Sequence, residues 1–246
     1  MPESDSARIS VALHVHTVYS ACAETRLEDI PGFCREHGID VLGVTDHDTI
    51  AGALALKAAA PELRLIIGEE IRTSSGEITG LFLNEEIEGG LSPIETCERI
   101  KAQGGLIYIP HPFDPFKFHR LRRHALREIL HLADIIEVFN GKANMPIFNT
   151  FAAAFAKRHG KLGAAGSDAH YLHAINLCTN MMADFRTPRE FLDNLRHAEL
   201  ITEHRWPLRT WWVGIKNVLR GEGHKVKHLH QRQIRSTKPE ARNKSK

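Results

Sequence analysis

The sequence predicts an α/β barrel, and three of its features lead to this fold class. Over the first two hundred residues, short runs rich in β-branched residues alternate with longer segments of helical pattern. Five of these runs lead directly into histidine or carboxylate side chains. An α/β barrel gathers such side chains at the carboxyl ends of several strands, whereas an open doubly wound sheet concentrates them at one switch point. The 246 residues, 42% of them apolar, suffice for one sizeable core.

The apolar runs place seven expected strands at 9–15, 40–45, 63–68, 77–83, 105–110, 134–139 and 161–166. Between and after them we expect helices at 26–37, 49–59, 92–103, 119–131, 144–159 and 187–197. Thr25 and Glu28 have the spacing of a capping box at the start of the first helix. Because helices separate the strands, the pattern predicts parallel strand pairs.

The C-terminal part differs from the body in charge and pattern. Residues 205–246 hold twelve Lys or Arg and two acidic residues, in a chain whose net charge is +2. We therefore expect a barrel over 9–200, an amphipathic helical extension over 201–222, and a basic, disordered tail over 223–246. The tail is interpreted as a solvated extension, as a nonspecific contact for nucleic acid, or as part of an anionic membrane contact.

The composition also indicates a compartment. No apolar run approaches the length of a transmembrane helix, and the polar start MPESDSARIS lacks the pattern of a secretory signal. The four cysteines lack CxxC spacing, which argues against a disulfide framework or a zinc knuckle. We expect a soluble, cytoplasmic protein without a transmembrane segment.

The first candidate site residues lie at the ends of the first two strands. His14 and His16 are two residues apart, so in a strand they project from one face, either as satisfied side chains or as metal ligands. The second strand leads into Asp46, His47 and Asp48. We assign His47 as a ligand, Asp46 as a residue that orients an imidazole, and Asp48 as a helix cap.

Later strands contribute further candidates. The third leads into Glu69 and Glu70, whose side chains face opposite ways, and we place Glu69 inward, where its carboxylate can bridge two cations. The mixture of nitrogen and oxygen ligands favours Mn²⁺, Zn²⁺ or Fe²⁺. With the residues that follow the fifth and seventh strands, the candidate metal ligands are His14, His16, His47, Glu69, His111, Asp168 and His170.

The ordered motifs HVHTVYS, VTDHDT, GEE, IPHPFD and GSDAH resemble those of the PHP (polymerase and histidinol phosphatase) superfamily over residues 9–200. The resemblance implies a distorted (β/α)₇ barrel with its active site at the C-terminal ends of the strands, two or three divalent metal ions, and hydrolysis of phosphoesters. By motif, the first metal ion would take four ligands: His14, His16, Glu69 and Asp168. Glu69 would bridge to a second ion held also by His111, and a third would take His47 and His170.

Two positions depart from the superfamily pattern. Many relatives have a histidine in the strand after the glutamate, where this chain has Thr79, and the change would weaken the second metal site. Cys22 stands six residues after His16, where some relatives have a metal-binding histidine. We interpret Cys22 as a structural thiol, with a soft ligand of the third ion as the alternative.

These residues predict a metal-dependent phosphoric ester hydrolase. Bound metal ions lower the pKa of water to roughly 7 and stabilise the charge on phosphoryl oxygens. The candidate catalytic residues are Glu69, beside the nucleophilic water, and His47 or His170, which in protonated form would assist the leaving group.

A basic segment follows His111. It forms either a solvated helix face or a grip on phosphate. At helical spacing Arg120 and Arg123 share a face, so they are candidate substrate-binding residues, with Asn140 as a further hydrogen-bonding group. The expected substrate is a small phosphorylated compound such as a nucleotide, hydrolysed by a phosphatase or phosphodiesterase.

Three alternatives remain open. The first is an exonuclease that holds short RNA or DNA with the basic tail. The second is an amidohydrolase-type C–N hydrolase, although such enzymes often bridge their metal ions with a modified lysine, which the proposed strand ends lack. The third is a nonenzymatic nucleic-acid-binding protein, which the presence of Thr79 keeps open.

Overall fold

The computed structural model describes residues 8–202. Residues 1–7 and 203–246 lie outside this part, and with them all of the predicted tail and most of the predicted helical extension. Ile201 and Thr202, the first two residues of that extension, belong instead to the last strand, so the folded body reaches at least to Thr202. Among the helices within residues 8–202, none combines the length and the apolar character that crossing a membrane requires.

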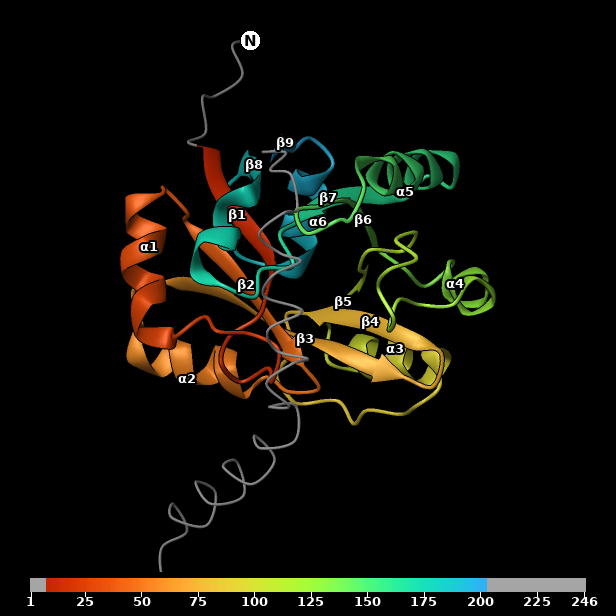
Figure 1. The fold of residues 1–246 in the computed structure, drawn as a ribbon, viewed down its shortest axis with the longest axis horizontal. Helices are drawn as coiled ribbons and strands as arrows, with labels where there is room; N and C mark the ends of the chain where they lie inside the picture. Colours follow the sequence, from red (N-terminus) through yellow and green to blue (C-terminus); the bar gives the residue numbers. More distant parts are fainter. Residues whose placement is uncertain (1–7, 203–246) are drawn as a thin grey trace, which may run out of the picture. The chain divides into compact units, whose positions relative to one another are not determined.

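A nine-stranded sheet forms the framework of the fold (Figure 1). Its spatial order is β7-β6-β5-β4-β3-β2-β1-β8-β9. After β7 the chain returns to β1 through hydrogen bonds from Ser167 N to Leu13 O and from His16 N to Ala169 O, both 2.9 Å long, which curl the sheet toward a closed barrel. The predicted barrel fold is therefore confirmed. The strands are β1 (Arg8–Val15), β2 (Val41–His47), β3 (Arg64–Thr73), β4 (Gly76–Leu81), β5 (Leu106–Ile109), β6 (Ile135–Asn140), β7 (Leu162–Gly166), β8 (Cys178–Ala183) and β9 (Glu199–Thr202).

The prediction of uniformly parallel pairs is wrong at β4. This strand pairs antiparallel with both β3 and β5, whereas β1–β2, β2–β3, β5–β6 and β6–β7 are parallel. Only Ser74 and Ser75 connect β3 to β4, and a connection this short can form a hairpin but not a crossover. Because β4 runs in the opposite direction, its first residues lie at the same barrel mouth as the last residues of β3.

Helices cover the outer face of the sheet, with α1 and α2 on one side and α3, α4 and α5 on the other (Figure 1). Ser92 and Glu95 form a capping box at the start of α3, whereas the box expected from Thr25 and Glu28 does not form. Arg26 is instead the N-cap of a short 3₁₀ turn, η1 (Leu27–Asp29), without a side-chain cap. The remaining elements are α1 (Ile30–Glu36), α2 (Ala51–Ala59), α3 (Pro93–Ala102), α4 (Arg123–Ile129), α5 (Pro146–Arg158), η2 (Leu172–Leu177) and α6 (Pro188–Leu195).

Apolar side chains fill the barrel below the mouth. Val11, Val41, Ile66 and Ile135 from four strands belong to one buried cluster, which Phe191 of α6 extends. Neighbouring positions such as Ile67 pack outward against the helices, as strand alternation requires. The apolar interior therefore holds the strand ends in fixed positions beneath the polar residues of the mouth.

Gly166, the last residue of β7, allows the backbone to pass close to polar side chains of the interior. A Cβ at this position would overlap Glu137 Oε1 and the hydroxyl oxygen of Tyr108. We expect Gly166→Ala to lower the free energy of unfolding by about 1–3 kcal/mol, because the overlap forces buried groups apart. Gly32 in α1 has no atom within 4 Å of such a Cβ, so Gly32→Ala should instead stabilise by about 0.5–1 kcal/mol. Urea unfolding of both variants measures these changes in the free energy of unfolding. Equal changes in the two variants would contradict the close contact assigned to Gly166.

Candidate metal centre

Eight buried or half-buried side chains meet at the barrel mouth, and we call them the histidine–carboxylate cluster. The cluster contains four overlapping groups of three residues, and within each group one ligand atom per residue lies within 4.8 Å of the others. Six of the seven predicted ligands belong to it, and Glu69 does not. Its members are His14, His16, His47, Glu70, Glu77, His111, Asp168 and His170.

Several cluster residues depart from ordinary strand backbone. His14, His111 and Asp168 have φ values of 61°, 30° and 50°, in a region that non-glycine residues seldom occupy. The pairing of β1 with β2 also shifts register between Ala12 and Val15. His14 and His16 thus lie side by side, with ring centroids 5.1 Å apart, through an irregular strand end rather than simple alternation. Such conformations cost on the order of 1–3 kcal/mol each and are concentrated at functional sites.

Glu70 lies at the centre of the cluster. Its Oε1 is 3.3 Å from His14 Nε2 and 3.2 Å from His111 Nε2, and its Oε2 is 3.3 Å from His16 Nε2 and 3.2 Å from His47 Nδ1. Burial alone would raise the pKa of this carboxyl, but the surrounding histidines hold it well below its usual range. Glu70 is therefore an ionised acceptor for positive charge in the interior.

The placement of Glu69 in the cluster is wrong. Glu70 lies on the same strand face as Ile66, which belongs to the barrel interior. Side chains alternate along a strand, so Glu69 must face the other way. Glu69 Oε2 accepts a hydrogen bond from Ile87 N at 2.9 Å, and burial raises the pKa of Glu69 to about 8. Of the two glutamates, Glu70 and not Glu69 is therefore the one that faces the histidines.

Glu137, on β6, accepts hydrogen bonds from two histidines of the cluster, a role that the sequence did not indicate. Its Oε1 accepts hydrogen bonds from His14 Nδ1 at 2.8 Å and from the Tyr108 hydroxyl at 2.7 Å. Its Oε2 accepts from His111 N at 2.6 Å and from Asn140 Nδ2 at 2.8 Å. The bond at Nδ1 leaves Nε2 of His14 directed at Glu70, as is typical of metal-ligating histidines held by an outer carboxylate.

Asp46 contacts the residues that follow His16. It accepts hydrogen bonds from Thr17 N at 2.7 Å and from Ser20 Oγ at 2.6 Å, and Ser20 Oγ is 3.4 Å from His16 Nδ1. Asp46 thus reaches the imidazole of His16 only through Ser20. Asp48 is not a helix cap, because the N-cap of α2 is Ile50 and Asp48 accepts a hydrogen bond from Arg72 N at 2.8 Å.

Glu77 is a second carboxylate that the sequence did not single out. It is the second residue of β4, and the hairpin directs it toward the mouth, where its Oε1 is 3.5 Å from His47 Nδ1. Burial, together with the charge of Glu70, raises the pKa of Glu77 to about 9. Thr79, where many superfamily members have a histidine, lies two residues further on the same strand face, so Glu77 stands near that position.

Two lysines neutralise part of the charge of Asp168. Lys117 Nζ forms an ion pair with Asp168 Oδ2, and Asn140 Nδ2 lies 3.4 Å from the same oxygen. Burial would raise the pKa of Asp168, but Lys117 and Lys142 hold it well below its usual range. Asn140 is therefore buried beside the cluster and bridges Glu137 to Asp168, which is compatible with the substrate contact predicted for it.

The histidines differ in their affinity for protons. Burial would lower the pKa of His14, but Glu70, Glu137 and Asp168 raise it well above its usual value, so the carboxylates attract positive charge to this point. Burial and His16 lower the pKa of His47 to about 3, and burial with Lys142 lowers that of His170. These shifts favour neutral, ligating imidazoles at His47 and His170 over the general-acid role predicted for them.

The cluster fits divalent metal ions. Five of its buried polar atoms have no hydrogen-bond partner within the described part of the chain: His14 Nε2, His16 Nε2, His47 Nδ1, Glu77 Oε1 and His111 Nδ1. Leaving such atoms unpaired is costly unless a ligand satisfies them. Imidazole nitrogens with carboxylate oxygens suit Mn²⁺, Fe²⁺ or Zn²⁺. Cys22 lies outside the four groups, and burial raises the pKa of its thiol to about 11.

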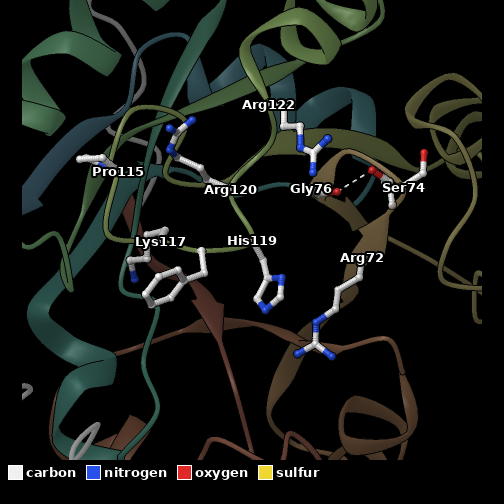
Figure 2. Close-up of a pocket in the computed structure, with 10 residues that line it drawn as sticks. Arg72, Ser74, Gly76, Pro115, Lys117, His119, Arg120 and Arg122 are labelled. Carbon is white, nitrogen blue, oxygen red and sulfur yellow. Dashed lines mark hydrogen bonds between the residues drawn. The ribbon is translucent and has the colours of Figure 1, made fainter.

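The two candidate substrate arginines are placed differently from the prediction. Helix α4 begins at Arg123, so Arg120 precedes it and the two arginines do not share a helix face. Arg120 lines a basic pocket with Arg72, Lys117 and Arg122 (Figure 2), whereas Arg123 is exposed outside it. The proline at 115 and the turns around it end any helical pattern before residue 123.

Comparison with known proteins finds similarity in sequence. A family model described as PHP-associated matches residues 146–200. Uncharacterized protein MJ0417 of Methanocaldococcus jannaschii is 33% identical over 198 residues, which cover 76% of this chain and 79% of the relative. Uncharacterized protein MJ1587 of the same organism is 39% identical over 154 residues, which cover 57% of this chain and 86% of the relative.

Solved structures show similarity in fold. A two-domain protein from Bacteroides vulgatus, containing a "predicted PHP-like metal-dependent phosphoesterase", superposes with a TM-score of 0.65 at 18% identity, over 82% of this chain and 67% of that one. PsfC from Pseudomonas syringae superposes with a TM-score of 0.65 at 15% identity, over 85% of this chain and 98% of PsfC. An amidohydrolase from Chromobacterium violaceum, with bound sulfate and no metal, superposes with a TM-score of 0.56 at 17% identity, over 78% of this chain and 97% of that one. Identities this low relate the folds alone.

Proposed function

Because the chain belongs to the PHP superfamily, we propose that it is a metal-dependent phosphoester hydrolase. The observation that carries the proposal is the convergence of unpartnered imidazole nitrogens around the ionised carboxylate of Glu70. Four overlapping ligand groups share His14, His16, His47 and Glu70 between them, which supports a centre of two or three ions. Ions bound there would supply water of lowered pKa and would offset charge on the phosphoryl oxygens.

The protein's own residues fix the geometry of this centre. Glu137 holds the ring of His14 through Nδ1 and the backbone of His111 through its amide, so two ligands from different strands share one anchor. Asp46 and Ser20 restrain the loop that carries His16. Preorganisation of this kind lowers the cost of binding both metal and substrate, because the side chains need not be ordered at that moment.

The substrate we propose is a nucleotide or another small phosphate ester. Lys117 pairs with Asp168 of the cluster, and Arg120 lines the same basic pocket as Lys117. Both would bind phosphate oxygens, with Asn140 as an uncharged hydrogen-bonding group near Asp168. Hydrolysis of p-nitrophenyl phosphate by Mn²⁺- or Zn²⁺-loaded protein, with loss of activity in EDTA, tests the reaction class. A metal-loaded protein that leaves a panel of phosphoesters untouched would refute it.

Metal binding should also be visible as stability. Because an ion binds the folded cluster and not the unfolded chain, an ion concentration one hundred times Kd should raise the free energy of unfolding by about 2.7 kcal/mol. Calorimetry of EDTA-treated protein with and without Mn²⁺ or Zn²⁺ measures this shift. His16→Asn should reduce it, whereas His131→Asn, an exposed histidine outside the cluster, should leave it intact. Equal shifts in both variants would place the ion elsewhere.

A second candidate function is C–N hydrolysis, which the fold similarity to an amidohydrolase favours. Glu70 rather than a lysine is shared between two of the ligand groups, which supports the phosphoesterase proposal instead. Assays of the same metal-loaded protein on amide and phosphoester substrates separate the two candidates.

A further inference from the structure

Helix α5 directs large apolar side chains outward. It packs against β6 and β7 and lies at the periphery of the fold (Figure 1). The side chains that it buries are those of Ala152 and Ala156, whereas Ile147 and Phe151 are 42% and 51% exposed. Because Ile147 and Phe151 are four positions apart, they share one face of the helix. A surface helix normally buries its large apolar residues, so packing within the fold does not account for this face.

The loop before α4 adds aromatic side chains beside the start of α5. Asp114 Oδ2 accepts hydrogen bonds from Asn144 N and Asn144 Nδ2, both 3.0 Å long, which tie this loop to the turn that leads into α5. The ring centroids of Phe116 and Phe148 are 6.2 Å apart, yet Phe116 is 57% exposed and Phe118 is 95% exposed. We call the exposed side chains of the two segments the α5 apolar patch: Phe116, Phe118, Met145, Ile147 and Phe151.

The α5 apolar patch differs from the ordinary scatter of apolar residues over a protein surface. Among residues 8–202 eight large apolar side chains are exposed, and five of them belong to the patch. Single exposed apolar residues need no explanation, but a group of them marks a surface that contacts another molecule or a membrane. The patch is therefore a surface that a partner covers.

Basic residues accompany the patch and acidic residues do not. The stretches 115–127 and 141–166, which carry the patch, contain nine Lys or Arg and no Asp or Glu, although the chain before residue 205 has more acidic than basic residues. Two of the nine have partners in the fold, Lys117 and Lys161. Within the described part of the chain the other seven form no ion pair with a carboxylate: Arg120, Arg122, Arg123, Arg127, Lys142, Lys157 and Arg158.

This charge decides which partner the patch fits. Two copies joined patch to patch would bring the same cations together, because a two-fold contact pairs like surfaces. Residues 205–246, with twelve basic and two acidic residues, carry charge of the same sign as the patch. The favoured partner is therefore anionic. Single-stranded nucleic acid stacks on aromatic rings and has little use for Met145 and Ile147, whereas an anionic bilayer takes up aromatic and other apolar side chains and attracts Lys and Arg.

We propose that the α5 apolar patch attaches the protein to an anionic membrane surface. Its five side chains enter the headgroup region of the bilayer, and the unpaired Lys and Arg residues around them contact anionic headgroups. Lys117 stands between Phe116 and Phe118 and pairs with Asp168 of the histidine–carboxylate cluster, so the attachment holds the barrel mouth close to the bilayer. The proposal does not depend on the reaction that the cluster catalyses.

Vesicle binding by the full chain tests the proposal. The wild type should sediment with large unilamellar vesicles made of equal parts phosphatidylcholine and phosphatidylglycerol, and more weakly with vesicles of phosphatidylcholine alone. The double variant Phe118→Ser/Phe151→Ser should bind the anionic vesicles at least about tenfold more weakly, because two apolar rings no longer enter the bilayer. Leu54→Ser is the matched control, since it removes an exposed apolar side chain from α2, on the other side of the sheet. No binding by the wild type, or equal binding by the double variant and the control, would overturn the proposal.

A second pair of variants tests the contribution of charge. Arg158 follows Phe151 by two helical turns and so lies on the same face of α5. Arg158→Gln should weaken binding to the anionic vesicles about fivefold, whereas Lys57→Gln, which removes an exposed cation from α2, should not. Equal effects of these two substitutions would contradict a bound orientation with the patch against the bilayer. Phe118→Trp keeps an aromatic ring suited to the interface and should bind at least as tightly as the wild type.

Two further measurements distinguish the membrane from other partners. If Phe118→Ser/Phe151→Ser weakens binding of a fluorescent oligothymidylate but leaves vesicle binding unchanged, the patch binds nucleic acid and the proposal is wrong. If light scattering shows a wild-type dimer that the double variant dissociates, and the wild type binds no vesicles, the patch joins two copies of the chain and the proposal is again wrong. All substituted side chains are exposed, so unchanged thermal unfolding should show that each variant keeps the fold.

Discussion

Glu70→Gln should abolish high-affinity metal binding and reduce phosphoester hydrolysis by well over a hundredfold. The carboxylate lies 3.2–3.3 Å from nitrogens of four histidines and is kept ionised by them. Substituting residues that merely orient a ligand lowers metal affinity or activity by about 10- to 100-fold, so loss of a central charged ligand should exceed that range. The amide of glutamine is neutral, so it cannot offset the charge of two cations. Its NH₂ group would also face the imidazole nitrogens that should bind those cations.

Glu69→Gln is the control, because it changes the adjacent residue in the same way. Burial raises the pKa of Glu69 to about 8, so its carboxyl is largely protonated at neutral pH, and a glutamine oxygen can still accept from Ile87 N. Elemental analysis of the purified variants, with kcat on p-nitrophenyl phosphate, should show metal lost in the first and kept in the second. The reverse result would restore Glu69 as the bridging residue and contradict the orientation of β3.

The sequence alone could not decide which of these two glutamates faces the barrel mouth. Side chains alternate along a strand, so one of the pair had to face the mouth, but the preceding residues Leu65, Ile66 and Ile67 are all apolar. When both faces of a strand are buried, composition does not reveal which parity points inward. The packing of Ile66 with Val41 and of Ile67 with the helices supplies the answer.

Elements with a strong local pattern were predictable. All seven runs predicted as strands form strands. Six of the seven proposed ligands meet, because parallel strands end at one mouth of the barrel. The strands β8 and β9 were missed, since CTNMMA and ELIT carry little apolar alternation and are fixed by pairing with β1 and with each other. Glu77 was missed because its place depends on the antiparallel turn at Ser74 and Ser75.

The role of Glu137 depends entirely on tertiary contacts. In the run IIEVF a lone acid stands among apolar residues, but nothing local indicated that it would accept four hydrogen bonds: one from β1, two from β5 and the segment just after it, and one from its own strand. The sequence thus indicated the candidate metal ligands, but it did not indicate the residues that orient those ligands. Outer residues of this kind are recognised by what they touch, and sequence spacing carries no such information.

Glu137→Gln should lower both the stability of the fold and its affinity for metal. Each carboxylate oxygen accepts two hydrogen bonds, from His14 and Tyr108 on one side and from His111 and Asn140 on the other. Whichever oxygen becomes an amide NH₂ then faces two donors, and buried donors without acceptors cost about 1–3 kcal/mol each. We expect the free energy of unfolding to fall by about 2–5 kcal/mol and metal affinity to fall about 10- to 100-fold.

Tyr108→Phe separates orientation from packing, because it removes one of the four donors and leaves the carboxylate in place. Burial raises the pKa of Tyr108 well above its usual value, as does the charge of Glu137, so the hydroxyl stays a donor and its loss should cost about 1 kcal/mol. Metal affinity in this variant should stay near that of the wild type, since His14 keeps its bond to Glu137. Urea unfolding and Mn²⁺ or Zn²⁺ titration of both variants provide the two readouts. If Glu137→Gln loses stability but binds metal as the wild type does, Glu137 anchors the barrel without orienting its ligands.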